Sequence, residues 1–455
     1  MGTLFGTDGI RGVVGVNLTV DLAFKVGQAV ATVLQEEKGK RPAILIGKDT
    51  RVSSDMLECA LIAGICSVGG NVLPLGVIPT PGVAYLTVLE KADAGIVISA
   101  SHNPYEHNGI KVFNDQGYKL PDEMELRVEE LILSDAQMPI KTGSEIGKCL
   151  RGMKVLKQAY INHLLSTVNC DLTGLRVLVD CANGAASATA PELFIKLPLQ
   201  ADFINMDPDG ININDRCGST HMDILSKAVV AGEYDLGIAF DGDADRCLLV
   251  DENGKIIDGD KVMAVCGATM QREGKLSGNT IVATVMSNLG LHEFCRNNGI
   301  ELVCTAVGDR NVLEKMLECD YATGGEQSGH TIFREYATTG DGELTALQFL
   351  QVFKQSGQKA SQLVSCCAQY PQELVNVKVD HTPGVKERIM ADETLWAMAR
   401  EKEALLNGEG RILLRPSGTE ALIRVMVEAK TTEIALQVAN DLANYIKKLS
   451  SLERI

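Results

Sequence analysis

Apolar runs alternate with helical patterns along most of the chain. The runs are rich in β-branched residues and show no polar alternation: AILIG (43–47), AGIVISA (94–100), LRVLVD (175–180), DLGIAF (235–240) and NTIVATV (279–285). Uninterrupted apolar strands of this kind are typical of mostly parallel sheets that are buried on both faces. The pattern therefore predicts an α/β fold.

A strand, a Gly or Ser turn, a helix and a second strand follow one another at 41–78, 175–206 and 279–307. We interpret this recurrence as three similar mixed α/β domains in series. The later segments ELVNVKVD, GRILLRPSG and ALIRVMVEAK precede a helical pattern over 432–449. They predict a smaller C-terminal α+β domain with antiparallel strands.

Polar segments near 141–147, 251–259 and 365–372 mark the expected joints between these domains. The predicted domains are therefore 1–145, 146–253, 254–368 and 369–455.

One charge-free stretch, 60–89, has the length of a membrane span, but it contains Pro74, Pro79, Pro81 and five glycines. It is better interpreted as a buried helix that ends at Gly69-Gly70, then the strand NVLPLGVI, then a PTPG turn. We expect no membrane association.

Composition supports a multidomain cytoplasmic protein. The 455 residues are 45% hydrophobic, which exceeds what one core usually organises. A net charge of −16 argues against nucleic-acid or anionic-membrane partners. The N-terminal segment MGTLFGTDGIRG lacks the charge and apolar pattern of a secretion signal. The thirteen cysteines are scattered, and we expect all of them to be reduced, buried thiols.

The hexapeptide SASHNP (99–104) follows the strand AGIVI. Ser101 is thus predicted in an exposed, fixed turn, which suits a nucleophile or a phosphate carrier. An ordinary Ser turn or helix cap is an equally good interpretation of this segment alone.

Three aspartates alternate in Asp241-Gly242-Asp243-Ala244-Asp245-Arg246, between two predicted strands. Carboxylates so placed can surround one hard cation. An EF-hand is excluded because Arg246 stands where that loop requires glycine. A solvated acidic turn is the remaining alternative.

Two further segments have the composition of ligand-binding loops. RPSGTE (415–420) with Arg424 combines arginines, hydroxyls and glycine, as a phosphate clamp would, although a turn with an ion pair fits equally well. GGEQSGH (324–330) presents polar groups between glycines, which suits sugar hydroxyls but also an ordinary tight turn. Together, the four motifs indicate metal-assisted phosphoryl transfer on a phosphosugar.

FGTDGIRG, SASHNP, DGDADR, GGEQSGH and RPSGTE occur in the order and approximate spacing of the α-D-phosphohexomutase superfamily, which the chain resembles over nearly its whole length. GININDRCGSTH (210–221), TAVGDRNVLEKM (305–316) and ATTGDGELTALQ (337–348) resemble its phosphoglucosamine mutase branch in particular. The resemblance implies a heart-shaped, four-domain architecture with a central cleft.

It also implies a role for each matching residue. Ser101 would be the phosphoserine and would bind one Mg²⁺ together with Asp241, Asp243 and Asp245. The reaction centre would be lined by Arg11, Lys111, Arg246 and His330, with Lys111 and His330 as candidates for proton transfer. The sugar hydroxyls would be held by Glu326 and Ser328, and the non-reacting phosphate by Arg415, Ser417, Gly418, Thr419 and Arg424. A purely structural histidine remains the alternative for His330.

The expected reaction interconverts glucosamine 6-phosphate and glucosamine 1-phosphate, a cell-wall sugar precursor. Glucosamine 1,6-bisphosphate would be both intermediate and activator. A homodimer and an activating kinase are further expectations. The alternatives are a phosphomannomutase or phosphoglucomutase, and a phosphosugar-binding regulator without turnover.

Two residues depart from the family pattern. Ala421 replaces a common proline after GTE, and His107 replaces a common acidic residue before NGIK. Neither removes a group that the chemistry needs, although Ala421 puts the rigidity of the phosphate loop in question.

Overall fold

The computed structural model describes residues 4–6, 8–134, 137–150, 153–380, 382, 384–417 and 420–451. These residues fall into two units. The first spans 1–286 with 299–365, and the second spans 287–298 with 366–455.

Three sheets in the first unit share one strand topology. In each sheet, a central strand pairs in parallel with one strand on either side. A fourth strand then pairs antiparallel with one of these two neighbours. The shared orders are β3-β2-β4-β5, β7-β6-β8-β9 and β12-β11-β13-β14. The prediction of three similar mixed α/β domains is confirmed, while their boundaries stay predictions.

The elements around the first sheet are β1 (Ile10–Val13), α1 (Val20–Lys38), β2 (Ala43–Lys48), α2 (Val52–Ser67), β3 (Asn71–Val77), α3 (Thr80–Leu89), β4 (Ala94–Ile98), β5 (His107–Asn114) and α4 (Asp122–Leu133). Alternate residues of β2 enter different cores. Ile44 and Ile46 pack with α1, α2 and α4, whereas Leu45 packs with α3 and α5 (Met153–Ser166). Burial on both faces explains the uninterrupted apolar runs.

The second sheet and its helices comprise β6 (Arg176–Asp180), α6 (Ala190–Ile195), β7 (Gln200–Ile204), α7 (Asp223–Ala231), β8 (Leu236–Phe240), β9 (Cys247–Asp251) and β10 (Ile256–Ile257). The third group comprises α8 (Gly259–Arg272), β11 (Thr280–Thr284), β12 (Glu301–Thr305), α10 (Asp309–Glu318), β13 (Thr323–Gly325), β14 (Thr331–Phe333), α11 (Gly342–Ser356) and α12 (Ala360–Leu363). Short 3₁₀ helices within the described ranges are η1 (Gly143–Glu145), η2 (Ala185–Ala188), η3 (Gly218–Thr220), η4 (Ser277–Asn279) and η5 (Val364–Cys366).

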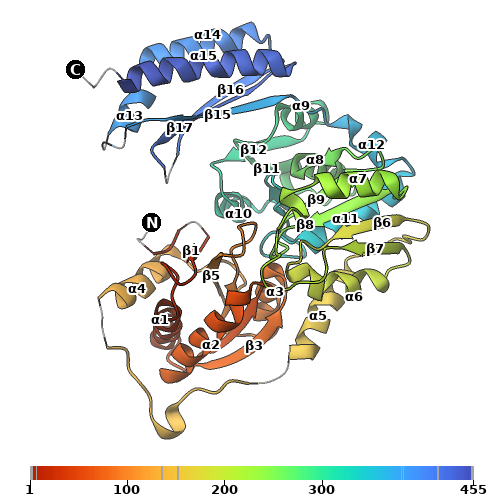
Figure 1. Cartoon of the computed structure of the whole chain (residues 1–455). Coiled ribbons are helices and arrows are strands. Elements are labelled where there is room, and N and C mark those ends of the chain that lie inside the picture. The colour runs from red at the N-terminus through yellow and green to blue at the C-terminus, as the bar shows by residue number, and fades with distance from the viewer. Residues whose placement is uncertain are drawn as a thin grey trace. The chain divides into compact units, whose positions relative to one another are not determined.

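The second unit is an antiparallel sheet with helices on one face (Figure 1). It comprises α9 (Leu289–Asn297), β15 (Gln372–Lys378), α13 (Val385–Met390), α14 (Glu393–Leu405), β16 (Arg411–Pro416), β17 (Leu422–Glu428) and α15 (Thr432–Ser451). Buried Glu428 accepts hydrogen bonds from Leu289 N at 2.8 Å and Arg411 Nε at 2.7 Å, which ties α9 to the sheet. The predicted α+β domain is confirmed.

Two local predictions were wrong. PTPG is not a turn but the start of α3, because a proline in the first helical turn lacks only an N–H that would have no partner there. Not all cysteines are buried: Cys59, Cys149, Cys304 and Cys366 are exposed. Cys304, for example, lies on β12, an edge strand whose side chains are less covered.

Within the described residues, no helix has both the length and the apolar composition needed to cross a bilayer. The stretch 60–89 is divided among α2, β3 and α3, as the prolines and glycines predicted apart from the PTPG segment.

Candidate active site

Ser101 lies in a left-handed turn after β4, with a φ of 52°. Its Oγ donates to Asp241 Oδ2 at 2.5 Å, and its backbone N donates to Ser99 Oγ at 3.0 Å. The predicted exposure was wrong, since only 1% of Ser101 is accessible. The cause is a second loop. Residues 241–246, which carry the three aspartates and are called the metal loop below, pack directly over the serine, so Ser101 is fixed as predicted but enclosed.

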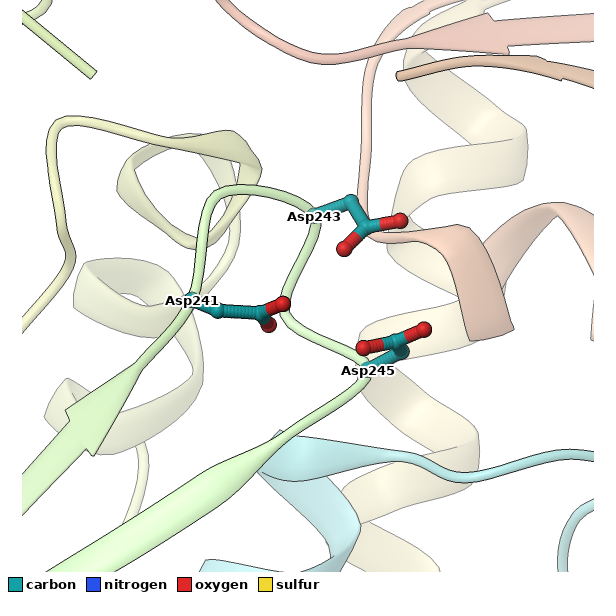
Figure 2. A group of neighbouring side chains, drawn as sticks. All are labelled: Asp241, Asp243 and Asp245. Atoms are coloured by element: carbon teal, nitrogen blue, oxygen red, sulfur yellow. The ribbon is translucent and has the colours of Figure 1, made fainter. Parts of the chain in front are cut away.

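The three aspartates lie on the loop that joins β8 to β9, as predicted (Figure 2). All three are buried, and one carboxylate oxygen from each lies within 4.8 Å of the others. Asp243 Oδ1 and Asp245 Oδ1 are buried without a hydrogen-bond partner among the described residues. Buried carboxylate oxygens of this kind require compensation, and hard oxygen donors suit Mg²⁺. The donor set fits the predicted metal.

Two cations already compensate part of this negative charge. Lys111 Nζ, which comes from β5, donates to Asp243 Oδ2 at 2.9 Å and lies 3.6 Å from Asp245 Oδ2. Arg246 follows the aspartates; its Nε lies 3.9 Å from Asp245 Oδ1, and its backbone N donates to Asp241 Oδ1 at 3.2 Å. Thr80, at the start of α3, adds a hydroxyl donor to Asp243 Oδ2 at 2.6 Å.

The crowding of like charges divides the carboxylates electrostatically. Burial, reinforced by the Asp245 and Asp243 carboxylates, raises the pKa of Asp241 well above its usual value. Burial would also raise the pKa of Asp245, but the Lys111 ammonium, His330 and Arg246 together outweigh this effect and the net shift is downward. Burial disfavours the charged form of Lys111, yet Asp243 and Asp8 reverse this effect and raise its pKa.

Asp8 links the reaction centre to a second lysine. Its carboxylate lies 3.1 Å from Lys111 Nζ and 2.7 Å from Lys119 Nζ, and it also contacts the guanidinium of Arg11 on β1. Lys119 Nζ also lies 2.6 Å from Asp309 Oδ2. Burial opposes ionisation of Asp8, but these cations lower its pKa well below the usual range. The predicted Arg11 and Lys111 therefore share one carboxylate.

His330 is buried between two acids. Its Nδ1 lies 3.7 Å from Asp245 Oδ2, and its Nε2 lies 3.8 Å from Asp309 Oδ2 and accepts the Gly340 N–H at 3.1 Å. Burial lowers the pKa of His330, but Asp245 offsets this effect and the net shift is upward. A Gly340 N–H donor implies that Nδ1 carries the proton of a neutral ring, facing Asp245.

The predicted sugar loop joins β13 to β14. Glu326 Oε1 accepts the Gly308 N–H at 3.1 Å, so this carboxylate is held by the segment TAVGDRN. Burial lowers the pKa of Arg246, but the carboxylates of Asp245, Asp241 and Glu326 raise it, and the net shift is upward. Ser328 is exposed on the same loop. Both residues can therefore contact a bound sugar, and Ser328 is more exposed to solvent than Glu326.

Arg415 and Arg424 lie in the second unit, directly opposite each other on β16 and β17. The Nε atoms of both are buried without a hydrogen-bond partner in the described part of the chain. Burial and the neighbouring Arg424 lower the pKa of Arg415. Facing like charges are unfavourable unless an anion lies between them. The pair has the character of an anion clamp.

The other clamp residues are only partly described. Ser417 follows β16, and its Oγ accepts the Glu420 N–H at 3.2 Å. Gly418 and Thr419 lie outside the described residues. Lys386 on α13, which the sequence did not indicate, donates to the carbonyl oxygens of Ser417 at 2.7 Å and Glu420 at 3.3 Å, so it braces the loop.

In the first unit, the structure brings together a hydroxyl nucleophile, three metal-ligand candidates and several cations. The predicted residues Ser101, Asp241, Asp243, Asp245, Lys111, Arg246 and His330 form one connected cluster. Sequence reasoning missed Thr80, Asp8, Lys119 and Asp309 as members. Asp8 and Asp309 stand inside the quoted segments FGTDGIRG and TAVGDRN, so charge inside those segments was an available signal. The cluster can support transfer of a phosphoryl group to and from an oxygen nucleophile.

Four family models match the chain in sequence order. They describe phosphoglucomutase/phosphomannomutase: alpha/beta/alpha domain I at 2–138, domain II at 158–254, domain III at 258–370 and the C-terminal domain at 374–445.

Individual proteins agree with these models. A curated phosphoglucosamine mutase of Acetivibrio thermocellus is 52% identical over 98% of this chain and 99% of its own length. A phosphoglucomutase/phosphomannomutase family protein of Burkholderia thailandensis shares the fold with a TM-score of 0.81 at 22% identity, covering 99% of both chains. N-acetylphosphoglucosamine mutase of Aspergillus fumigatus, solved with GlcNAc-6P and magnesium, has a TM-score of 0.66 at 17% identity, covering 99% of this chain and 96% of its own.

Proposed function

Because the chain belongs to the phosphoglucomutase/phosphomannomutase family, we propose that it interconverts glucosamine 6-phosphate and glucosamine 1-phosphate through phosphorylated Ser101. Identity of 52% to a phosphoglucosamine mutase over nearly the whole chain is the observation that carries the choice of sugar. The 2.5 Å contact between Ser101 Oγ and Asp241 supports the choice of phosphoryl carrier.

In the first step, O1 of glucosamine 6-phosphate attacks the phosphorus of phospho-Ser101. The P–O1 bond forms, the P–Oγ bond breaks, the O1 proton passes to the neutral imidazole of His330, and the ammonium of Lys111, the other proton-transfer candidate, can donate a proton to the departing Ser101 oxygen. The bonding electrons of P–Oγ remain on the Ser101 oxygen. Glucosamine 1,6-bisphosphate results.

In the second step, the bisphosphate turns over and Ser101 Oγ attacks the phosphorus at O6. The P–O6 bond breaks, O6 takes back a proton, and glucosamine 1-phosphate leaves the regenerated phosphoenzyme. Arg415 and Arg424 hold whichever phosphate is not reacting, together with Ser417, Gly418 and Thr419. Glu326 and Ser328 bind sugar hydroxyls, so that both orientations are accepted.

Asp241, Asp243 and Asp245 would hold Mg²⁺ beside Ser101. When bound, this ion supplies positive charge that offsets the charge on the transferring phosphoryl group. Lys111 and Arg246 contribute fixed positive charge at the same place, which is worth more where water is excluded. Arg11 adds a further cation through its shared contact with Asp8.

We further propose that glucosamine 1,6-bisphosphate or an activating kinase supplies the first phosphoryl group. The enzyme would act in the cytoplasm, as a homodimer, on small phosphosugars.

The experiment for sugar choice compares kcat/KM for glucosamine 6-phosphate, glucose 6-phosphate and mannose 6-phosphate, each with its matching 1,6-bisphosphate. Small differences in a sugar pocket are typically worth about 10- to 200-fold in specificity. We expect glucosamine phosphate to lead by a factor in this range, with measurable glucose activity. A higher value for glucose or mannose would contradict the choice of sugar but leave the phosphoserine chemistry in place.

A further inference from the structure

The turn that presents Ser101 has a backbone conformation that needs support. Its φ of 52° lies in the left-handed region, which is unfavourable for a residue other than glycine. Relaxation to a right-handed conformation would rotate Oγ away from Asp241. The surroundings of the Ser101 and Asn103 carbonyls show what holds the turn in place.

Arg51 contacts both carbonyls from the first sheet. It lies between β2 and α2 and is 1% exposed. Its Nη2 donates to Ser101 O at 3.1 Å and Asn103 O at 2.6 Å. Asp49 pairs with its Nη1 and also accepts the Arg51 N–H at 3.0 Å, so the guanidinium is itself held on both sides.

Asn214 reaches the same two carbonyls from the second sheet. It belongs to GININDRCGSTH, the segment to which the reaction assigns no role. Its Nδ2 donates to Ser101 O at 2.9 Å and Asn103 O at 3.2 Å. Asn214 N donates to Ala182 O at 2.9 Å, which anchors the residue to the loop after β6.

The metal loop closes the remaining side of the Ser101 carbonyl. A Cβ at Gly242 would lie 2.5 Å from Ser101 O and 2.8 Å from Asn214 Nδ2. Only glycine allows this approach, because both distances are shorter than side-chain contacts normally are. The serine turn, Asn214 and the metal loop are therefore packed against one another, so movement of Asn214 would be transmitted to the distance between Ser101 Oγ and Asp241.

We propose that Arg51 and Asn214 are positioning residues that hold the Ser101 and Asn103 carbonyls and thereby keep Ser101 Oγ directed at Asp241. Neither side chain contacts Oγ, so each acts on the nucleophile through the backbone. Arg51 and Asn214 come from the loops of different sheets. The orientation of Ser101 therefore depends on how the loops of the first sheet pack against those of the second. This inference rests on the proposed role of Ser101.

The test measures how fast glucosamine 1,6-bisphosphate phosphorylates dephosphorylated enzyme, with the site identified by peptide mass spectrometry. Asn214→Asp is nearly isosteric, but it replaces the donor with an oxygen that repels both carbonyls. Asn212→Asp is the matched control, since the Asn212 side chain contacts Asp207 O and Asp209 N of its own loop instead. Arg51→Lys is the second variant, and Arg176→Lys is its control, because Arg176 also donates to two carbonyls, those of Gly232 and Glu233.

A misplacement of about 1 Å can cost about 100-fold in rate, so we expect Asn214→Asp to slow phosphorylation of Ser101 by about 10- to 100-fold. The KM for glucosamine 6-phosphate, the Mg²⁺ affinity and the melting temperature should match those of Asn212→Asp. Arg51→Lys should also be slower than Arg176→Lys, because one ammonium cannot reproduce the planar fork.

Equal rates for Asn214→Asp and Asn212→Asp would overturn the positioning role alone. A rate loss that merely follows a loss of folded protein would also overturn it. Absence of phosphate on Ser101 in the wild-type enzyme would instead overturn the proposed function, and the positioning role with it.

Discussion

Charge is balanced differently in the reaction centre and around the pair Arg415 and Arg424. In the reaction centre, buried carboxylates are interleaved with Lys111 and Arg246, and Asp243 Oδ1 and Asp245 Oδ1 have no hydrogen-bond partner among the described residues. In the C-terminal sheet, Arg415 and Arg424 face each other, with Glu420 3.7 Å from Arg424. The first region is mostly neutralised from within, whereas the second carries an excess of one sign.

This contrast separates the two tasks. A site that performs chemistry benefits from charges that are already oriented, because no reorganisation is needed as charge develops in the transition state. A site that binds and releases a phosphate benefits from charge that only the ligand neutralises. Substitutions in the first region should therefore affect kcat and folding, and substitutions in the second should affect KM.

The largest effect is expected from Ser101→Ala, which removes the phosphoryl carrier. Turnover should fall on the order of 10⁴-fold or more, by analogy with loss of a catalytic nucleophile. The measurement is kcat with bisphosphate-primed enzyme and a circular dichroism check of folding. Ser166→Ala, on the exposed face of α5, is the control and should retain full activity. Near-normal turnover in Ser101→Ala would refute the mechanism.

The next largest effect concerns the metal ligands. Asp243→Asn should lower kcat by about 100-fold or more, because Lewis-acid stabilisation is worth several kcal/mol. Excess EDTA should stop the wild-type enzyme, and added Mg²⁺ should restore it. Calorimetric titration with Mg²⁺ would report the lost affinity in Asp243→Asn. Full activity in EDTA would show that the carboxylates serve another purpose.

Removing a cation from the reaction centre should also destabilise the fold. Lys111→Met leaves Asp8, Asp243 and Asp245 less compensated, and loss of one partner of a buried ion pair costs about 3–5 kcal/mol. Denaturant unfolding in EDTA would measure this change in the free energy of unfolding. Mg²⁺ should recover part of the loss, since it neutralises the same carboxylates. An unchanged stability would mean that the centre is not neutralised from within.

A smaller effect on activity is expected from Arg424→Met in the second region. The KM for glucosamine 6-phosphate should rise by about 10- to 100-fold, because a hydrogen bond to a charged group is worth about 1.5–3 kcal/mol. The change in kcat should be much smaller than in Asp243→Asn. Arg400→Met, on an exposed part of α14, is the control. A pure kcat effect would contradict the clamp.

The smallest effect is expected on stability without ligand. Arg424→Met removes a like-charge cross-strand contact, which typically costs a few tenths of a kcal/mol to about 1 kcal/mol. Its melting temperature should be unchanged or higher than that of the wild type by up to about 3 °C, whereas that of Lys111→Met should be lower. Inorganic phosphate should then stabilise the wild type more than the variant. A clear loss of stability in Arg424→Met would indicate that the pair is already neutralised.

Much of this arrangement could be predicted because its signals are local. The apolar runs identified the buried strands, and the motif order identified the family, which the family models confirm. The alternating aspartates on one loop identified the only cluster of metal-ligating side chains found within the described residues. Each of these features depends on neighbouring residues of the sequence.

The features that sequence reasoning missed depend on contacts between distant segments. Ser101 was expected to be exposed because its own turn is open, but a loop about 140 residues away covers it. Arg51 and Asn214 approach Ser101 from 50 and 113 residues away, and their immediate neighbours in the sequence give no sign of this. Periodicity describes how an element is buried, whereas these contacts are decided by which loops of two sheets meet.

The central claim is tested most directly by following one labelled phosphoryl group. Enzyme carrying ³²P on Ser101 is mixed with an equimolar amount of glucosamine 6-phosphate, quenched at short times and separated into protein and sugar fractions. We predict that label leaves Ser101 and enters glucosamine 1,6-bisphosphate at least as fast as kcat, and that Ser101→Ala never acquires label. Label that stays on the protein while glucosamine 1-phosphate forms would contradict the account.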